Sequence, residues 1–139
     1  MYRRTTAQLL LPEEFRLPFG GALNPANRWV RIAGAVDWWT LEENYAACFK
    51  KSNRGKPAYG VRVALGALII QNRLKLTDAE TVASITENPY MQYLLGFEAF
   101  DGTKPPFSPS QMVRFRKRLD AALLRDVNKT IRKALRERS

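Results

Sequence analysis

The stretch "VRVALGALIIQNRL", residues 61–74, decides the fold class of this 139-residue chain. Its apolar residues lie on nearly every side of a helix instead of forming one stripe, which predicts a helix buried all round. Nowhere does the chain show the sustained period-two alternation of a half-buried strand. The sequence therefore predicts an all-α fold, a compact domain of about six helices with residues 61–74 at its centre.

Capping signals place further helices on both sides of this central one. Asn24 with Pro25 at the first helical position predicts one helix start, and Asp37 predicts another. After the central helix, Thr77 and Glu80 match a capping box, in which each side chain can accept from the other residue's amide. Asn88 and Pro89 are predicted to end that helix and start a short one, and Gly96 is the predicted C-cap of the short helix.

These patterns divide the chain into three segments. Residues 1–23 are predicted to be an irregular N-terminal arm, because proline and glycine punctuate them and no period holds. Residues 24–120 form the helical domain, with a basic loop over residues 50–57. Residues 121–139 form a basic helical extension at the C-terminus.

The charge of the chain points to its partners. The formal net charge is +10 and the pI is about 10.2, which favours nucleic acid over a membrane surface or an acidic protein. Histidine is absent and Cys48 is the single cysteine, so the usual metal ligands and catalytic bases are missing. We therefore expect no cofactor, no metal and no enzymatic activity from this chain alone. No signal peptide or membrane span is predicted, so a soluble, intracellular protein is expected.

A second stretch, "PPFSPSQMVRFRKRL" at residues 105–119, carries the functional prediction. Ser108 is predicted as the N-cap, Pro109 as the first helical residue and Gln111 as the capping-box partner. Apolar residues then recur at helical spacing, which predicts one helix running to about Leu135. The face opposite this apolar stripe is basic.

Charge segregation favours this basic helix as a DNA reader. Residues 77–103 hold acidic residues but no lysine or arginine, whereas basic residues dominate from Lys104 onward. A buried helix and a capped helix precede it, as in a helix-turn-helix module, whose recognition helix reaches base edges with its first turns. The predicted base-reading residues are Ser110, Val113, Arg114 and Lys117. The predicted phosphate contacts are Arg3, Arg4, Lys50, Lys51, Arg54, Lys56, Arg116 and Arg118.

Two alternatives stay open at this point. Residues 76–85, "LTDAETVASI", resemble the second helix of a simple helix-turn-helix, but the helix after them, "YMQYLLGF", has no positive charge and is better explained by core packing. The chain is alternatively a protein-interaction or oligomerisation module that binds nucleic acid only non-specifically. This reading is motivated by the long amphipathic helix over residues 119–135, which could pair with another copy.

Three stretches carry a family resemblance, in this order: "NRWVRIAGAVDWW", "GKPAYGVRVALGALIIQNRLKLTDAETVASITENPYMQYLLGFEAF" and "PPFSPSQMVRFRKRL". With them the chain resembles the N-terminal domain of bacterial transposases of the insertion-sequence-5 class. The resemblance runs from about Phe19 to Leu119. It implies a helical domain that binds double-stranded DNA at the terminal inverted repeats of its element. It also implies partnership with a catalytic domain of the Asp-Asp-Glu type, where magnesium would bind, and a bacterial, cytoplasmic, nucleoid-associated location. The chain is expected to stop where that domain begins.

Overall fold

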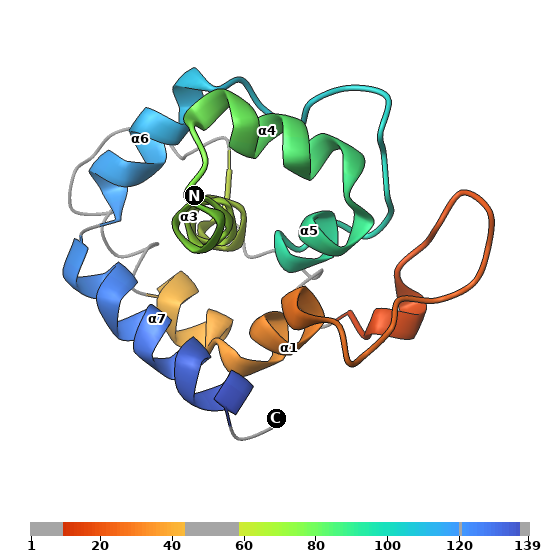
Figure 1. Cartoon of the computed structure of the whole chain (residues 1–139), viewed down its shortest axis with the longest axis horizontal. Coiled ribbons are helices and arrows are strands. Elements are labelled where there is room, and N and C mark those ends of the chain that lie inside the picture. Colours follow the sequence, from red (N-terminus) through yellow and green to blue (C-terminus); the bar gives the residue numbers. More distant parts are fainter. Residues whose placement is uncertain (1–9, 44–58, 120, 137–139) are drawn as a thin grey trace.

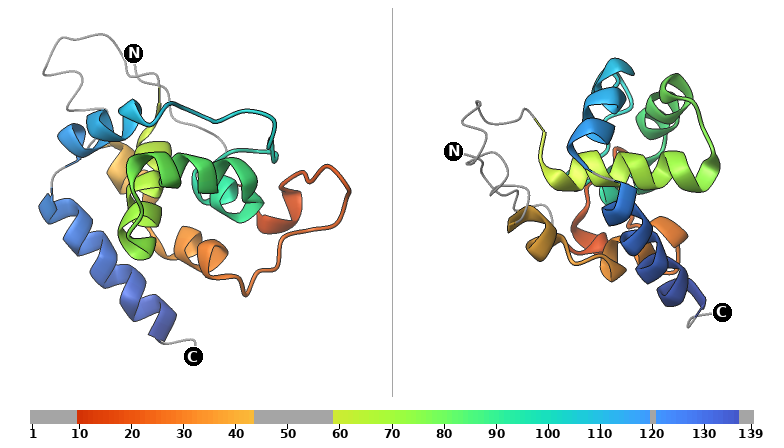
Figure 2. Two further views of the ribbon diagram at one scale, coloured as in Figure 1. Left: turned by 45° about the horizontal axis from the view of Figure 1, so that its top comes forward. Right: turned by 90° about the vertical axis from the view of Figure 1, so that its left-hand side faces the viewer.

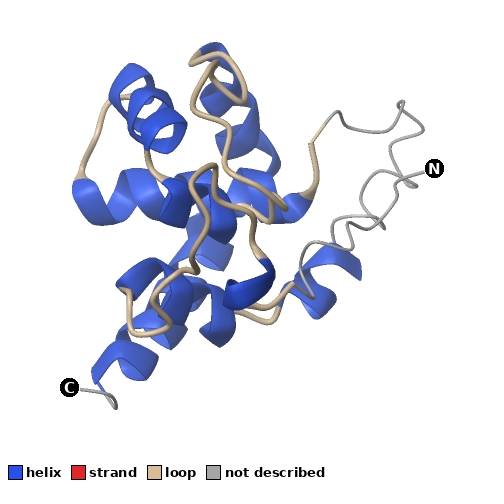
Figure 3. Ribbon diagram, turned by 90° about the vertical axis from the view of Figure 1, so that its right-hand side faces the viewer, coloured by secondary structure: helices blue, strands red, loops and turns tan. Residues whose placement is uncertain are grey.

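The computed structural model describes residues 10–43, 59–119 and 121–136, and within these ranges the chain is all-α, as predicted. Figure 3 shows helices joined by loops, and the extended pairing in the described part is an isolated parallel bridge between Arg16 and Ala99. Residues 38–43 are also helical, up to the edge of the described range. The other helices, in chain order, are η2 Pro12–Glu14, α1 Arg28–Ala35, α3 Val61–Leu74, α4 Asp78–Glu87, α5 Pro89–Leu94, α6 Ser110–Arg118 and α7 Ala121–Arg136.

Helix α3 lies at the centre of the molecule. Figure 1 looks along its axis and shows α4, α5, α1, α7 and α6 arranged around it. Its side chains are buried on all sides, and Leu65, Ile69 and Ile70 have no exposed surface. Burying each of these side chains contributes about 1.5–3 kcal/mol. The helix has the bounds that its sequence predicts, and it is the core on which the other helices pack.

Most of the predicted caps are confirmed. The Thr77 hydroxyl accepts a hydrogen bond from the Glu80 amide at 3.1 Å, and the Glu80 carboxylate accepts one from the Thr77 amide at 2.9 Å. The Asn88 side chain accepts from two amides of α5. Gly96 follows α5 with a φ of 90°, a conformation that glycine adopts without the steric cost of a Cβ. Asp37 caps the next helical stretch by accepting from the amide three residues on.

Helix α5 is a core helix, as its lack of positive charge predicts. Met91, Tyr93 and Leu94 are buried. The buried Arg62 of α3 donates from Nε to the Leu94 carbonyl at 2.9 Å and from Nη2 to the Tyr93 carbonyl at 3.0 Å. Burial lowers the pKa of this guanidinium to about 10. The end of α5 is thus tied to α3 by charge-assisted bonds, and α5 cannot present a reading face to DNA.

The predicted start of the first helix was wrong by one turn. Asn24 and Pro25 do not begin α1; the side chain of Asn24 accepts from the Ala26 amide at 2.9 Å and its carbonyl accepts from the Asn27 amide at 3.0 Å. That turn places Asn27 at the N-cap, where its side chain accepts from the Trp29 amide at 2.8 Å. Asn27, and not Asn24, caps the helix because the helical spacing of apolar residues begins at Trp29.

The predicted single helix from residue 108 to Leu135 was also wrong. Helix α6 ends at Arg118, and Leu119 takes an extended conformation with φ −114° and ψ 114°. Leu119 is buried, so the break lets one apolar stripe pack on two different surfaces. Helix α6 packs on α3, whereas α7 packs on α1 and α3. A straight helix over residues 110–136 would be about 40 Å long and could not bury both halves of its stripe on this core.

Candidate nucleic-acid interface

The inner face of α6 is fixed by apolar contacts. Met112 and Phe115 are fully buried or nearly so. Phe115 also makes edge-on contacts with Phe107 at 5.2 Å and with Tyr59 at 5.9 Å between ring centroids. Phe107 and Tyr59 contact each other in the same way. Aromatic pairs of this geometry add about 0.5–1.5 kcal/mol beyond their burial, so this cluster sets which side of α6 faces outward.

The four predicted base-reading residues lie on the outer face of α6. Ser110, Arg114 and Lys117 are exposed, and Val113 is 42% exposed although it is apolar. At ~100° per residue these positions span one side of the helix, opposite the buried residues. The structure brings them together as the helical period predicts; their contact with bases stays a prediction.

Arg116 has a different setting from the other basic residues of α6. Its guanidinium donates to Asp78 Oδ1 at 2.8 Å and Oδ2 at 3.0 Å, and to Gln71 Oε1 at 3.0 Å. Hydrogen bonds from Arg116, and then from Gln71, hold the pKa of the Asp78 carboxyl below its usual range. Arg116 thus forms an ion pair that joins α6 to α4 and α3, and its contact with phosphate stays a prediction. Its side chain is 44% exposed, so the outer edge of the guanidinium still reaches solvent.

The predicted capping box at the start of α6 was wrong. The Ser108 hydroxyl is 2.9 Å from the Ser110 hydroxyl and does not cap the helix. Pro109 is the N-cap, in a helical conformation with φ −57° and ψ −30° and without a side-chain hydrogen bond to the first turn. The chain has already turned at Ser108 and Pro109, and the amide of Gln111 bonds to the Ser108 carbonyl instead. The hydroxyls of both serines stay exposed beside the first turn.

Gln92 fixes the loop that leads to α6. Its side-chain nitrogen donates to the carbonyls of Ile85, Thr86 and Asp101 at 3.0, 3.3 and 2.9 Å. Its side-chain oxygen accepts from the Asp101 amide at 3.0 Å. Gln92 is 2% exposed; its bond to Ile85 is buried, and the other three are part-buried. Sequence reasoning missed this residue, since a glutamine inside a short apolar helix carries no signal of its partners.

The remaining predicted phosphate contacts fall in two groups. Arg118 is the exposed last residue of α6. Six others lie outside the described residues, and the structure does not place them: Arg3, Arg4, Lys50, Lys51, Arg54 and Lys56.

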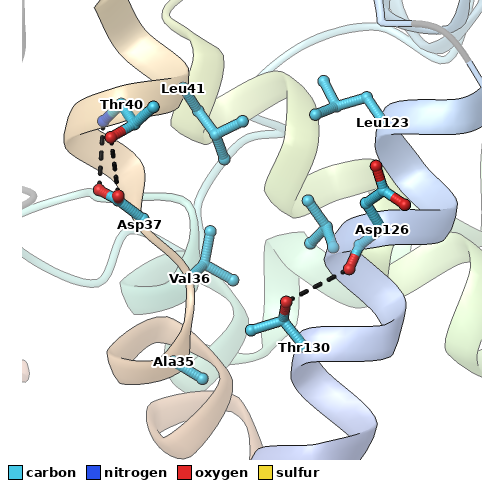
Figure 4. Close-up of a pocket in the computed structure, with 9 residues that line it drawn as sticks. Ala35, Val36, Asp37, Thr40, Leu41, Leu123, Asp126 and Thr130 are labelled. Carbon is cyan, nitrogen blue, oxygen red and sulfur yellow. Dashed lines mark hydrogen bonds between the residues drawn. The ribbon is translucent and has the colours of Figure 1, made fainter.

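A hollow of about 240 Å³ lies between the end of α1 and α7, away from α6. Figure 4 shows Val36 and Leu41 on one wall and Leu123 on the other, with Asp37 and Asp126 at the edges. Within the ranges that the structure describes, no three histidine, cysteine or acidic side chains gather where a metal could bind. None of the described helices is long and apolar enough to span a bilayer.

Comparison with known proteins identifies the family of this chain. The family model described as "Transposase domain (DUF772)" matches residues 19–118, which run from the loop before α1 to the last residue of α6. A protein of Rhizobium meliloti described as "Uncharacterized protein ORF8 in nfe locus" is 32% identical over 105 residues, or 76% of this chain. The matched part is 49% of that protein, so the chain spans about half the length of this relative. No solved structure matches the chain. Because the family model covers most of the helical domain, the chain belongs to the DUF772 transposase domain family.

Proposed function

We propose that this chain binds DNA sequence-specifically, with α6 as the helix that enters the major groove. One observation carries the proposal: the outer face of α6 is basic and exposed, while its inner face is locked on α3 by buried residues. A fixed inner face supports this role, because base readout requires side chains held in one register. The major groove is wide enough to admit a helix of this size.

Each side chain on the outer face suits a particular contact. Arg114 can donate two hydrogen bonds to the O6 and N7 of guanine, and Val113 can contact a thymine methyl group. Ser110 lies in the first turn of α6, where helix amides favour phosphate oxygens. Lys117 lies one turn after Arg114 and can reach a base edge or the neighbouring phosphate.

The DNA that we propose as the target is the terminal inverted repeat of an insertion sequence of the insertion-sequence-5 class. Membership of a transposase domain family supports this choice, and so does the resemblance of residues 19–119. A DNA-recognition domain brings the catalytic part of a transposase to the ends of its element. The chemistry itself is assigned to a separate catalytic domain, which we propose as a partner of this chain.

The test compares binding to a duplex carrying the repeats that flank the gene with binding to a scrambled duplex of equal length. Arg114→Ala should weaken binding to the repeat by roughly 10- to 100-fold and binding to the scrambled duplex by only a few-fold, since a bidentate base contact is worth about 1–3 kcal/mol of discrimination. Arg16→Ala is the control: it removes one exposed charge far along the chain from α6 and should weaken binding to both duplexes by less than about threefold. Equal losses on both duplexes for Arg114→Ala would refute base reading by α6.

The assembly alternative has weaker support. It was motivated by an apolar stripe on the C-terminal helix that lacked a partner, but Val127 and Ile131 of α7 are buried within this chain. Sedimentation over a wide concentration range separates the two functions. A mass that rises with concentration, together with equal binding to both duplexes, would favour assembly over DNA reading.

A further inference from the structure

Most of the basic residues of helix α7 lie on one side. Arg125, Lys129, Arg132 and Arg136 are exposed and follow each other at steps of four, three and four, whereas the exposed Lys133 lies about 40° to the side of them, toward Asp126. At ~100° per residue the first four fall within about 60° of one another, on a stripe about 16 Å long. We call these four residues the α7 stripe. The only carboxylate among the residues of α7 is Asp126.

Asp126 lies on another side of α7. Figure 4 shows Leu123, Asp126 and Thr130 facing the hollow beside α1. Their positions are roughly 60° or more from the α7 stripe around the helix. Asp126 is three residues before Lys129, and this single carboxylate leaves most of the charge of the stripe unneutralised. Arg125, Lys129 and Arg132 form no ion pair with any described residue.

Two arginines from other helices extend this surface. Arg28, at the start of α1, and Arg132 of α7 both lie near Arg73, in the last turn of α3. Burial, and then the charges of Arg28 and Arg132, lower the pKa of the Arg73 guanidinium. Three helices thus contribute guanidinium groups to one region. Basic side chains at the end of a helix are favourable for that helix, which explains Arg73 and Arg136 but not Arg28, Arg125, Lys129 or Arg132.

Like charges at these spacings oppose folding. Arg125 with Lys129, and Arg132 with Arg136, are pairs at i and i+4, where same-sign charges destabilise a helix by a few tenths of a kcal/mol. A surface that served only solubility would mix both signs, as the exposed faces of helices usually do. Repulsion of this kind is relieved when a polyanion binds, because each phosphate neutralises one cation and releases a counterion.

The position of α7 points to the same partner as α6. Figure 1 and the right view of Figure 2 place α6 and α7 on the same side of the molecule, with α3 crossing between them. A hollow of about 300 Å³ between them is lined by Leu68 and Leu124 together with polar and basic residues: Gln71, Asn72, Lys75 and Arg116. A duplex that received α6 in its groove would pass close to α7. The family model ends at residue 118, so α7 lies outside the segment that it matches.

We propose that the α7 stripe, with Arg28 and Arg73, binds the phosphate backbone of the duplex whose groove receives α6. The inference rests on the proposed function for the identity of the duplex. Contacts of this kind add affinity and orientation but carry no sequence information. The α7 stripe would set how the domain lies along the DNA, while α6 would set which sequence it prefers.

The test uses the full chain and two matched double variants. Lys129→Gln/Arg132→Gln removes one lysine and one arginine from the α7 stripe. Arg16→Gln/Lys104→Gln removes one of each from exposed positions on loops. Binding to the repeat duplex and to the scrambled duplex is measured from about 0.05 to 0.3 M salt. Each lost phosphate contact should reduce the slope of log K against log salt by about 0.9.

For the stripe variant we expect a slope reduced by about 2 and binding about tenfold weaker at 0.15 M salt, by the same factor on both duplexes. The control should change its slope by well under 1. Arg132→Lys keeps the charge and should retain the slope, which separates a lost contact from a folding defect. A slope equal to that of the control would overturn the proposal and leave an acidic protein as the partner to seek.

The two proposals fail separately. If Arg114→Ala leaves the preference for the repeat unchanged while the stripe variant loses its slope, base reading by α6 is wrong and the α7 contact stands. If Arg114→Ala abolishes the preference for the repeat and the stripe variant keeps its slope, base reading by α6 stands and the α7 contact is wrong.

Discussion

The guanidinium of Arg116 lies against both carboxylate oxygens of Asp78, at 2.8 and 3.0 Å, and joins α6 to the first turn of α4. Gln71 of α3 donates to Asp78 Oδ1 at 2.7 Å and accepts from Arg116 at 3.0 Å. Three helices therefore meet at one polar cluster on the edge of the proposed DNA-binding face. The aromatic contacts of Phe115 hold the inner side of α6 against the core, and this polar cluster restrains rotation of α6 about its own axis.

Asp78→Asn should destabilise the protein in a pH-dependent way. The pKa of this carboxyl is lowered, first by the bond from Arg116 and then by the bond from Gln71. The unfolded carboxyl, with a pKa of about 3.9, takes up its proton at higher pH than the folded one. The stabilisation is therefore complete well above pH 4 and is lost as pH falls through the folded pKa. We expect a loss of up to about 1 kcal/mol at pH 7 that vanishes near pH 2, measured by urea unfolding.

Asp126→Asn is the matched control for this measurement, because Asp126 lies exposed on α7. It should change the free energy of unfolding by less than about 0.5 kcal/mol at every pH. An Asp78→Asn deficit of the same size at pH 7 and pH 2 would show that the ion pair does not stabilise the fold.

Much of the fold follows from local sequence. Residues 61–74 are apolar on all sides and could only be a central helix, and the Thr77–Glu80 box lies within four residues. The break at Leu119 could not be predicted in this way, because the apolar spacing continues across it and only the shape of the core forces the chain to turn. The Arg116–Asp78 pair spans 38 residues, so it depends on how α6 packs and not on any local pattern. The outer face of α6 was predictable because one helical period defines it.

Gly66→Ala should destabilise the protein although alanine is the better helix former. A Cβ at this position would lie 3.0 Å from Leu95 Cδ1 and 3.3 Å from Leu95 Cγ, in the buried contact between α3 and α5. Overpacking of this kind costs about 1–3 kcal/mol, more than the roughly 1 kcal/mol gained in helix propensity. Gly34→Ala in α1 meets nothing within 4 Å and should stabilise by about 0.5–1 kcal/mol. Thermal unfolding of both variants tests the contrast, and two shifts of the same sign would contradict it.

Gln92→Met should cost about 2–4 kcal/mol. Methionine has a similar length but removes the donors to three carbonyls and the acceptor for the Asp101 amide in a buried site. Buried groups left without a partner cost about 1–3 kcal/mol each when no water replaces the bond. Gln111→Ala, at the start of α6, should cost less than about 0.5 kcal/mol. If urea unfolding gave similar values for the two variants, the Gln92 network would have no special role.

Asp78→Asn should also change DNA recognition, and in a direction that loss of a phosphate contact could not produce. The substitution removes one negative charge beside α6 and weakens the hold on Arg116, so binding to a scrambled duplex should strengthen by a few-fold. The same loosening leaves α6 less fixed, so the ratio of affinities for the repeat and the scrambled duplex should fall. Asp126→Asn removes an equal charge from α7 without touching α6, and it should raise both affinities while leaving their ratio unchanged. An unchanged ratio in Asp78→Asn would mean that the apolar contacts of Met112 and Phe115 alone hold α6 in its reading position.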